Sequence, residues 1–162
     1  MSEDQKDRIV VGVDGSEPSK QALRWASFLA LSAGLSIDVV SAWHIPWTSA
    51  EGWPANLDPE QETAQMLDKA IRDVLGAEPA VPVRQRVHRG SAAAVLLDAS
   101  RNARLLTVGS RGHGGFSGLL LGSVSMACAE HAPCPILIVH GDDPPPAAGA
   151  APKLQNVAER TD

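Results

Sequence analysis

The chain has 162 residues, of which 44% are hydrophobic, and this is enough for one domain with a core packed between layers. Its net charge of −5 offers no basic surface for DNA or RNA, so we expect no nucleic-acid partner. The first residues, MSEDQKDR, are charged, and no stretch approaches the ~18 apolar residues that span a bilayer. We therefore expect a cytoplasmic protein with no membrane contact.

The first half of the chain predicts two strands and two helices. Residues 8–14 (RIVVGVD) form a β-branched run that stops at the turn signal Asp-Gly-Ser. Ser16 as a cap and Pro18 in the first turn begin a helix, and Gly34 ends it. Residues 37–43 predict a second strand, and residues 59–75 carry apolar side chains at helical spacing. Between them, residues 44–58 form a long loop of the kind that often serves as a lid.

The second half continues the alternation. Residues 81–87 alternate, and their proline and arginines suit the edge of a sheet. We expect a third helix over 91–103, a central strand over 105–109, a fourth helix over 122–132 and a last strand over 136–139. Five strands alternating with four helices indicate a single-domain, doubly wound α/β fold, a parallel sheet with helices on both faces.

The most informative motif is a pair of glycine turns after the central strand. Gly109 and Gly112 are followed, after nine intervening residues, by Gly122 and Ser123. Glycine lets backbone N–H groups converge where a Cβ would block them, and the first amides of a helix lack partners within the helix. Such amides attract anions. The loop 109–115 is therefore predicted to hold phosphate, with Arg111 and His113 as candidate side-chain partners; the alternative is a flexible surface loop.

Gly109, Gly112, Gly122 and Ser123 match a family motif, G-x2-G-x9-G-[ST], without a gap. The opening VVGVDGSEPS also resembles the first strand and turn of the proteins that carry this motif. Over residues 8–140 the chain resembles the universal stress proteins, in the subfamily that binds ATP. The resemblance implies the strand order 3-2-1-4-5, in which strands 1 and 4 are neighbours. It also implies ATP with Mg²⁺ as the ligand and a homodimer formed through strand 5, from Pro135 to His140.

The resemblance assigns roles to individual residues. It places Asp14 at the adenosine end of the site, and the same carboxylate is a candidate Mg²⁺ ligand; the alternative is a residue that only forms the turn. Ala42 matches the place where backbone groups meet the adenine, and Ser123 and Ser125 are expected to cap the fourth helix or to bind phosphate. No catalytic residue is predicted. The predicted nucleotide-binding residues are Gly12, Val13, Asp14, Gly15, Ser16, Ala42, Gly109, Ser110, Arg111, Gly112, His113, Gly114, Gly115, Gly122, Ser123, Val124 and Ser125.

The sequence favours a binder over an enzyme. Neither GxxxxGK[ST] nor GxGxxG occurs, and the lysines lie outside the glycine loop. The resemblance to the universal stress proteins implies that this binder acts in a stress response, with nucleotide occupancy biasing its conformation or partners. The alternatives are an enzyme that hydrolyses nucleotide or transfers adenylate, and a protein that binds a cyclic nucleotide, cAMP.

Three segments organise the chain: an N-terminal extension (1–7), the α/β domain (8–141) and a disordered tail rich in proline and alanine (142–162). Cys128 and Cys134 are interpreted as small buried residues, because no cysteine or histidine has the spacing of a metal site.

Overall fold

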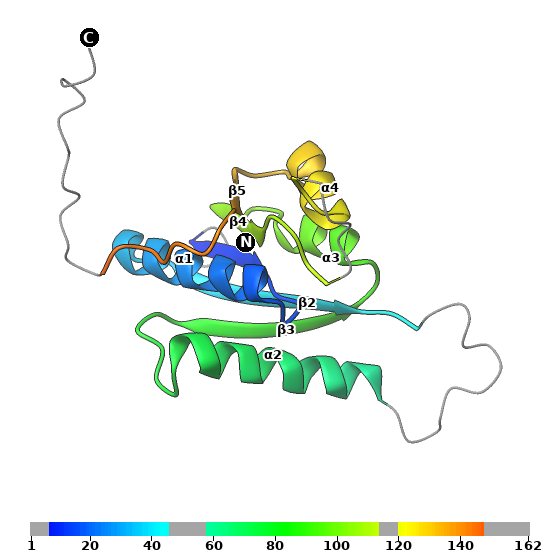
Figure 1. The fold of residues 1–162 in the computed structure, drawn as a ribbon, viewed down its shortest axis with the longest axis horizontal. Coiled ribbons are helices and arrows are strands. Elements are labelled where there is room, and N and C mark those ends of the chain that lie inside the picture. The colour runs from blue at the N-terminus through cyan, green and yellow to red at the C-terminus, as the bar shows by residue number, and fades with distance from the viewer. Residues whose placement is uncertain (1–6, 46–57, 114–119, 148–162) are drawn as a thin grey trace, which may run out of the picture.

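The computed structural model describes residues 7–45, 58–113 and 120–147 (Figure 1). Within these residues, five parallel strands form one sheet in the order β3-β2-β1-β4-β5, which confirms the predicted fold and strand order. The elements are β1 (Arg8–Gly12), α1 (Glu17–Ala33), β2 (Ser36–Trp43), α2 (Pro59–Leu75), β3 (Val83–Arg89), α3 (Ala92–Ala99), β4 (Leu105–Gly109), α4 (Ser123–His131) and β5 (Ile136–Val139).

The sheet is covered on both faces, and each face has its own core. Ile9 and Val11 of β1 point toward α1 and α2, whereas Val10 between them points toward α3 and α4. Figure 1 shows α2 on one side of the sheet and α3 with α4 on the other. Because side chains alternate along each strand, consecutive apolar residues in β1 fill both cores, as expected for a parallel sheet that is buried on both faces.

The turn after β1 and the two ends of α1 agree with the signals predicted from the sequence. The side chain of Ser16 accepts a hydrogen bond from the amide of Ser19, and Gly34 ends α1 with a left-handed φ of 68°. Strand β1 ends at Gly12, two residues before the predicted end, although the amide of Val13 still donates to Val40 at 3.0 Å. Asp14 therefore lies in the turn just beyond the strand.

Strand β3 begins later than predicted. It runs from Val83 to Arg89 instead of over 81–87, in register with residues 37–43 of β2. Pro82 has no N–H to donate, and only its carbonyl joins the ladder, accepting from Ile37 at 2.9 Å. The edge position is confirmed, because β3 ends the sheet next to β2.

The third helix is shorter than predicted. It ends at Ala99 instead of residue 103, and two tight turns follow it. Asn102 adopts a left-handed φ of 62°, which asparagine tolerates better than most residues. These turns return the chain to β4, which begins at Leu105.

After β5, residues 142–147 run along α1 (Figure 1). The carbonyl of Asp143 accepts hydrogen bonds from the side chains of Gln21 and Trp25, the latter at 3.2 Å. The remainder of the predicted tail, 148–162, lies outside the described residues, as do residues 46–57 of the predicted long loop. In the described ranges, no helix is long and apolar enough to cross a membrane.

Candidate functional site

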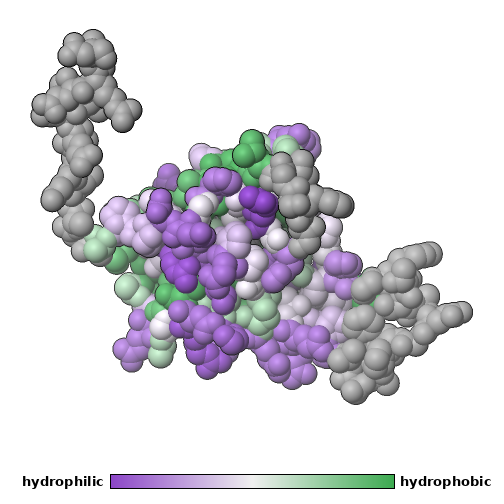
Figure 2. Space-filling view, viewed as in Figure 1, coloured by the Kyte–Doolittle hydropathy of each residue, from purple (hydrophilic) through white to green (hydrophobic). Residues whose placement is uncertain are grey.

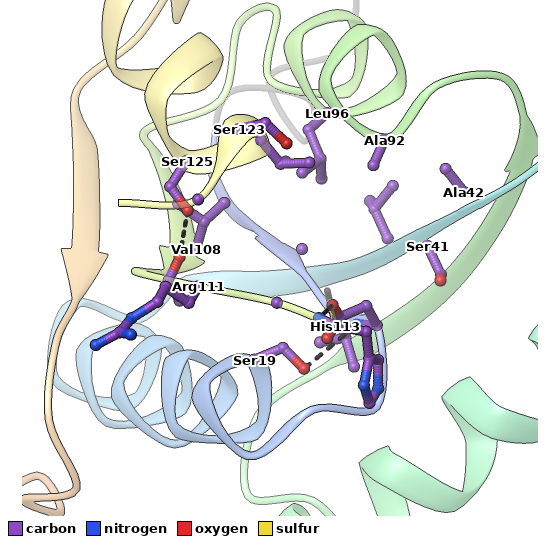
Figure 3. A pocket seen from close by; sticks show the side chains of 18 of the residues that line it. Ser19, Ser41, Ala42, Ala92, Leu96, Val108, Arg111, His113, Ser123 and Ser125 are labelled. Atoms are coloured by element: carbon purple, nitrogen blue, oxygen red, sulfur yellow. Dashed lines mark hydrogen bonds between the residues drawn. The ribbon is translucent and has the colours of Figure 1, made fainter. Parts of the chain in front are cut away.

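A cavity of about 530 Å³ opens beyond the carboxyl ends of β1, β2 and β4, beside α3 and the start of α4 (Figure 3). Ligands bind at this place in doubly wound sheets, because β1 and β4 are neighbours that lead to helices on opposite faces. The volume lies within the range of about 300–1,000 Å³ that is typical of small-molecule sites.

Most residues predicted from the sequence line this cavity: Gly12, Val13, Asp14, Ala42, Gly109, Arg111, Gly112, His113, Gly122, Ser123, Val124 and Ser125. Gly15, Ser16 and Ser110 lie next to it but do not line it. Gly15 has a φ of 83° and lies against Met66 of α2, Ser16 caps α1, and Ser110 is buried. Gly114 and Gly115 fall outside the described residues.

Sequence reasoning missed the apolar wall of the cavity. Its members share no motif and come from strand ends, from two helices and from the segment before α4: Val40, Ala92, Leu96, Val108, Leu121 and Met126. One signal pointed to part of it. A Cβ added at Gly12 would lie 2.8 Å from Cδ1 of Leu96, so the glycine in VVGVDGS lets α3 approach β1 closely. The polar residues Ser19 and Ser41 also line the cavity and were not predicted.

Asp14 joins two loops that are far apart in the sequence. Its Oδ1 accepts hydrogen bonds from the backbone N–H of Ser16, at 3.0 Å, and from the hydroxyl of the same residue. Its Oδ2 accepts from the backbone N–H of His113 at 3.1 Å. Burial by itself would raise the pKa of Asp14, but the hydrogen bonds from Ser16 and His113, together with Ser19, outweigh it and lower the pKa. The group is therefore a carboxylate at neutral pH.

The first turn of α4 faces the cavity without a side-chain cap. Gly122 is the N-cap residue and has no side chain with which to satisfy the amides of the first turn. The expectation that Ser123 caps this helix is therefore wrong, because the helix already begins at Ser123, one residue too early for Ser123 to be its N-cap. Ser123 is exposed and lines the cavity instead. An uncapped helix N-terminus of this kind favours an anion.

Ser125 has a structural role within the same turn. It is buried, and its hydroxyl lies 2.7 Å from the carbonyl oxygen of Gly109 and 3.1 Å from that of Ser110, to which it donates. The amide of Gly122 donates to the carbonyl of Ser110 at 2.8 Å. These contacts attach the start of α4 to the end of β4 and fix the direction in which the uncapped amides point.

The two side chains of the glycine loop that were predicted to contact phosphate, Arg111 and His113, do not point into the cavity. Figure 3 shows the guanidinium of Arg111 directed away from its centre and the ring of His113 beside the turn that follows β1. The backbone of the loop, and not the charged end of Arg111 or the ring of His113, therefore faces the cavity.

The described residues contain no cluster of three or more histidine, cysteine, aspartate or glutamate side chains that could hold a metal ion. Asp14 is the one carboxylate among the residues that line the described cavity, and both of its oxygens already accept hydrogen bonds. A Mg²⁺ ion here would therefore depend mainly on ligand oxygens and water, as it commonly does beside phosphates.

The fold and the cavity define a doubly wound α/β protein with a candidate ligand site between β1 and β4. The model of the universal stress protein family matches residues 6–140, and the chain belongs to this family. A universal stress protein of Mycolicibacterium smegmatis is 34% identical over 145 residues, which cover 83% of this chain and 48% of that protein. The chain thus spans about half the length of this curated relative.

Solved structures support the fold. A universal stress protein determined in complex with cAMP has a TM-score of 0.60 and 24% identity, covering 85% of this chain and 98% of that one. A universal stress protein from Archaeoglobus fulgidus determined in complex with dAMP has a TM-score of 0.56 and 18% identity, covering 81% and 95%. At these identities the likeness establishes the architecture alone.

Proposed function

We propose that this protein binds ATP, together with Mg²⁺, in the cavity between β1 and β4, and that occupancy regulates its conformation or partners in a stress response. The observation that carries the proposal is the uncapped start of α4, which presents backbone amides to the cavity next to Gly109 and Gly112. Phosphate oxygens are the natural acceptors for such amides.

The opposite end of the cavity suits a purine base. Val40, Ala92 and Leu96 provide an apolar wall, and Ala42 lies where β2 ends. A flat apolar base packs on such a wall, while the backbone near Ala42 supplies hydrogen bonds to its edge. In this arrangement Mg²⁺ is carried by the phosphate oxygens, with Asp14 as the nearest carboxylate of the described lining.

Regulation by occupancy is favoured over turnover because the described lining contains no lysine and no histidine directed at the phosphate end. Incubation with ATP and Mg²⁺, followed by chromatography of the nucleotides, tests this choice. We expect stoichiometric retention of ATP. Rapid, saturable release of AMP, ADP or pyrophosphate would instead establish an enzyme that hydrolyses nucleotide or transfers adenylate.

Cyclic AMP is a second candidate ligand, because Arg111 points away from the cavity and backbone amides alone suffice for a single phosphate. Mass spectrometry of small molecules released from freshly purified protein, followed by calorimetry with ATP and cAMP, separates the candidates. We expect ATP to bind at least about tenfold more tightly, which is ~1.4 kcal/mol. Tighter binding of cAMP would reverse the assignment, and binding of neither would remove the proposed function.

We also propose that two copies associate through β5, the strand at one edge of the sheet. Beside this edge, Leu120 is 78% and Met126 47% exposed, and they border an apolar groove with Leu121, Ile138 and His140. Figure 2 shows hydrophobic residues gathered over the region of α4 and β5. A second copy would cover both the apolar surface and the unpaired edge.

Light scattering with a charged substitution tests the dimer. Leu120→Glu is expected to convert a dimer into a monomer at micromolar concentration. Leu31→Glu is the control and is expected to leave the dimer intact, since Leu31 is also exposed, at 46%, but lies near the end of α1 instead of along this edge. A wild-type monomer would contradict the proposal.

A further inference from the structure

The three glycines of the motif are not required for the same reason. A Cβ added at Gly109 would lie 2.7 Å from the backbone carbon and oxygen of Pro18, so this glycine lets β4 pass the start of α1. A Cβ added at Gly122 would meet its nearest neighbours only at 3.5 Å or more, which is ordinary contact. Gly122 therefore has room beside it for an added side-chain carbon.

Gly112 differs from both. A Cβ added there would come well within 3.0 Å of Oδ2 of Asp14, so this carboxylate, the end of a side chain, would have to leave its hydrogen bonds and move. The backbone of Gly112 does not have a positive φ, so an alanine at this position would not strain the backbone. It would destabilise the protein only through its contact with the carboxylate. The space that this glycine leaves free is already occupied by a side chain of the same protein.

The carboxylate that occupies this space is held from both sides. Oδ1 receives two hydrogen bonds from Ser16, at the start of α1, and Oδ2 receives the amide of His113 from the glycine loop. Asp14 and His113 are 99 positions apart in the sequence, and Asp14 is exposed at the rim of the cavity. The contact thus joins the glycine loop to the turn after β1.

We propose that Asp14 is a positioning residue for the glycine loop, and that Gly112 must be glycine because the Asp14 carboxylate fills the space of its side chain. The contact orients the backbone around Gly112 before a nucleotide arrives, which reduces the ordering cost of binding. This inference rests on the proposed function and refines it, since it assigns the shape of the glycine loop to a side chain of the turn after β1.

A double-mutant cycle in the ligand-free protein tests the contact itself. The variants are Asp14→Ala, Gly112→Ala and both together, with unfolding followed in urea. We expect Gly112→Ala to lower the unfolding midpoint clearly in the wild-type background and to have little further effect when Asp14 is alanine, because the collision is then absent. Equal losses in both backgrounds would overturn the proposal.

Gly122→Ala is the matched control, a glycine of the same motif whose added Cβ has room. Its effect on the midpoint is expected to be small and to be the same with or without Asp14. If Gly122→Ala couples to Asp14 as strongly as Gly112→Ala does, the specific contact is not the cause and the proposal fails.

A second measurement asks whether the contact positions the loop for binding. Calorimetry with ATP is expected to show a loss of about tenfold or more for Gly112→Ala, and a smaller loss for Asp14→Asn than for Asp14→Ala, because asparagine retains one acceptor oxygen. Wild-type affinity in Gly112→Ala would overturn the positioning role even if the cycle shows coupling. If the wild-type protein binds no nucleotide, the proposed function fails while the unfolding cycle still decides the contact.

Discussion

The two ends of the cavity are built from different parts of the chain. One end is a wall of side chains, Val40, Ala92 and Leu96, contributed by β2 and α3. The other end is a backbone surface formed by Gly109, Gly112 and the first turn of α4. An apolar wall recognises shape and is tolerant of small changes, whereas backbone amides recognise a charge and tolerate no side chain in their way.

This difference predicts that substitutions at the two ends change affinity for different portions of a nucleotide. Substitutions at the backbone end should lower the affinity for ATP and leave the affinity for adenosine largely unchanged. At the side-chain end they should affect both equally. The predictions that follow use this contrast, and each can weaken it.

Gly122→Val is expected to have the largest effect. Its φ of −75° and ψ of 167° suit a β-branched residue, so the fold should persist, while the added methyl groups enter the space at the start of α4. We expect ATP affinity to fall about a hundredfold or more, ~2.7 kcal/mol, with a much smaller change for adenosine. Calorimetry measures both ligands, and thermal unfolding verifies the fold. Ala33→Val, on the exposed end of α1, adds a similar volume outside the site and should change neither affinity.

Ala92→Phe tests the side-chain end. The new ring extends from the first residue of α3 into the apolar portion of the cavity. We expect ATP and adenosine affinities to fall together by about tenfold, ~1.4 kcal/mol, because the base is displaced in both ligands. A loss confined to ATP, measured by the same calorimetry, would show that the base does not occupy this end.

The sequence predicted the backbone end much better than the side-chain end. Glycines at fixed spacing after a strand are visible because each removes a side chain, and Gly109, Gly112 and Gly122 all line the cavity. Ala92 and Leu96 carry no such signal, since apolar residues on α3 could equally belong to a core, and only the three-dimensional fold brings them to β2. The contact of Asp14 with Gly112 was invisible for the same reason, although both residues were among the predicted ones.

The fold was predictable because the alternation of apolar strands with helices determines the layers, whereas element ends depended on finer contacts. Asn102 closes a turn that shortens α3, and Pro82 joins β3 only through its carbonyl. Neither event disturbs the periodic pattern of the sequence, and this is why the predicted ends of α3 and β3 were wrong.

Ser125→Ala is expected to have a moderate effect on the backbone end. The hydroxyl donates to the carbonyls at Gly109 and Ser110, so its loss leaves buried acceptors with fewer partners. We expect the free energy of unfolding to fall by about 1–2 kcal/mol. Ser123→Ala is the matched control in the same turn: Ser123 is exposed, so its removal should leave stability unchanged while reducing ATP affinity severalfold. Equal stability of the two variants would indicate that Ser125 does not hold the turn.

The smallest expected effect is a pH dependence that distinguishes the turn after β1 from the rest of the cavity. Hydrogen bonds from Ser16 and His113 lower the pKa of Asp14 below its ordinary value of 3.8, despite the opposing effect of burial. Because the folded pKa is depressed, the carboxylate contributes stability that is fully present above the unfolded pKa and is lost as the pH falls through the folded one. Unfolding in urea between about pH 5 and pH 3 should therefore show a steeper loss of stability for wild type than for Asp14→Asn, which cannot titrate. The groups that face this carboxylate are the amide and hydroxyl of Ser16, the hydroxyl of Ser19 and the amide of His113, none of which titrates in this interval. Parallel slopes for the two proteins would mean that protonation of Asp14 leaves the two loops joined, and that the contact depends on packing around the side chain and not on its charge.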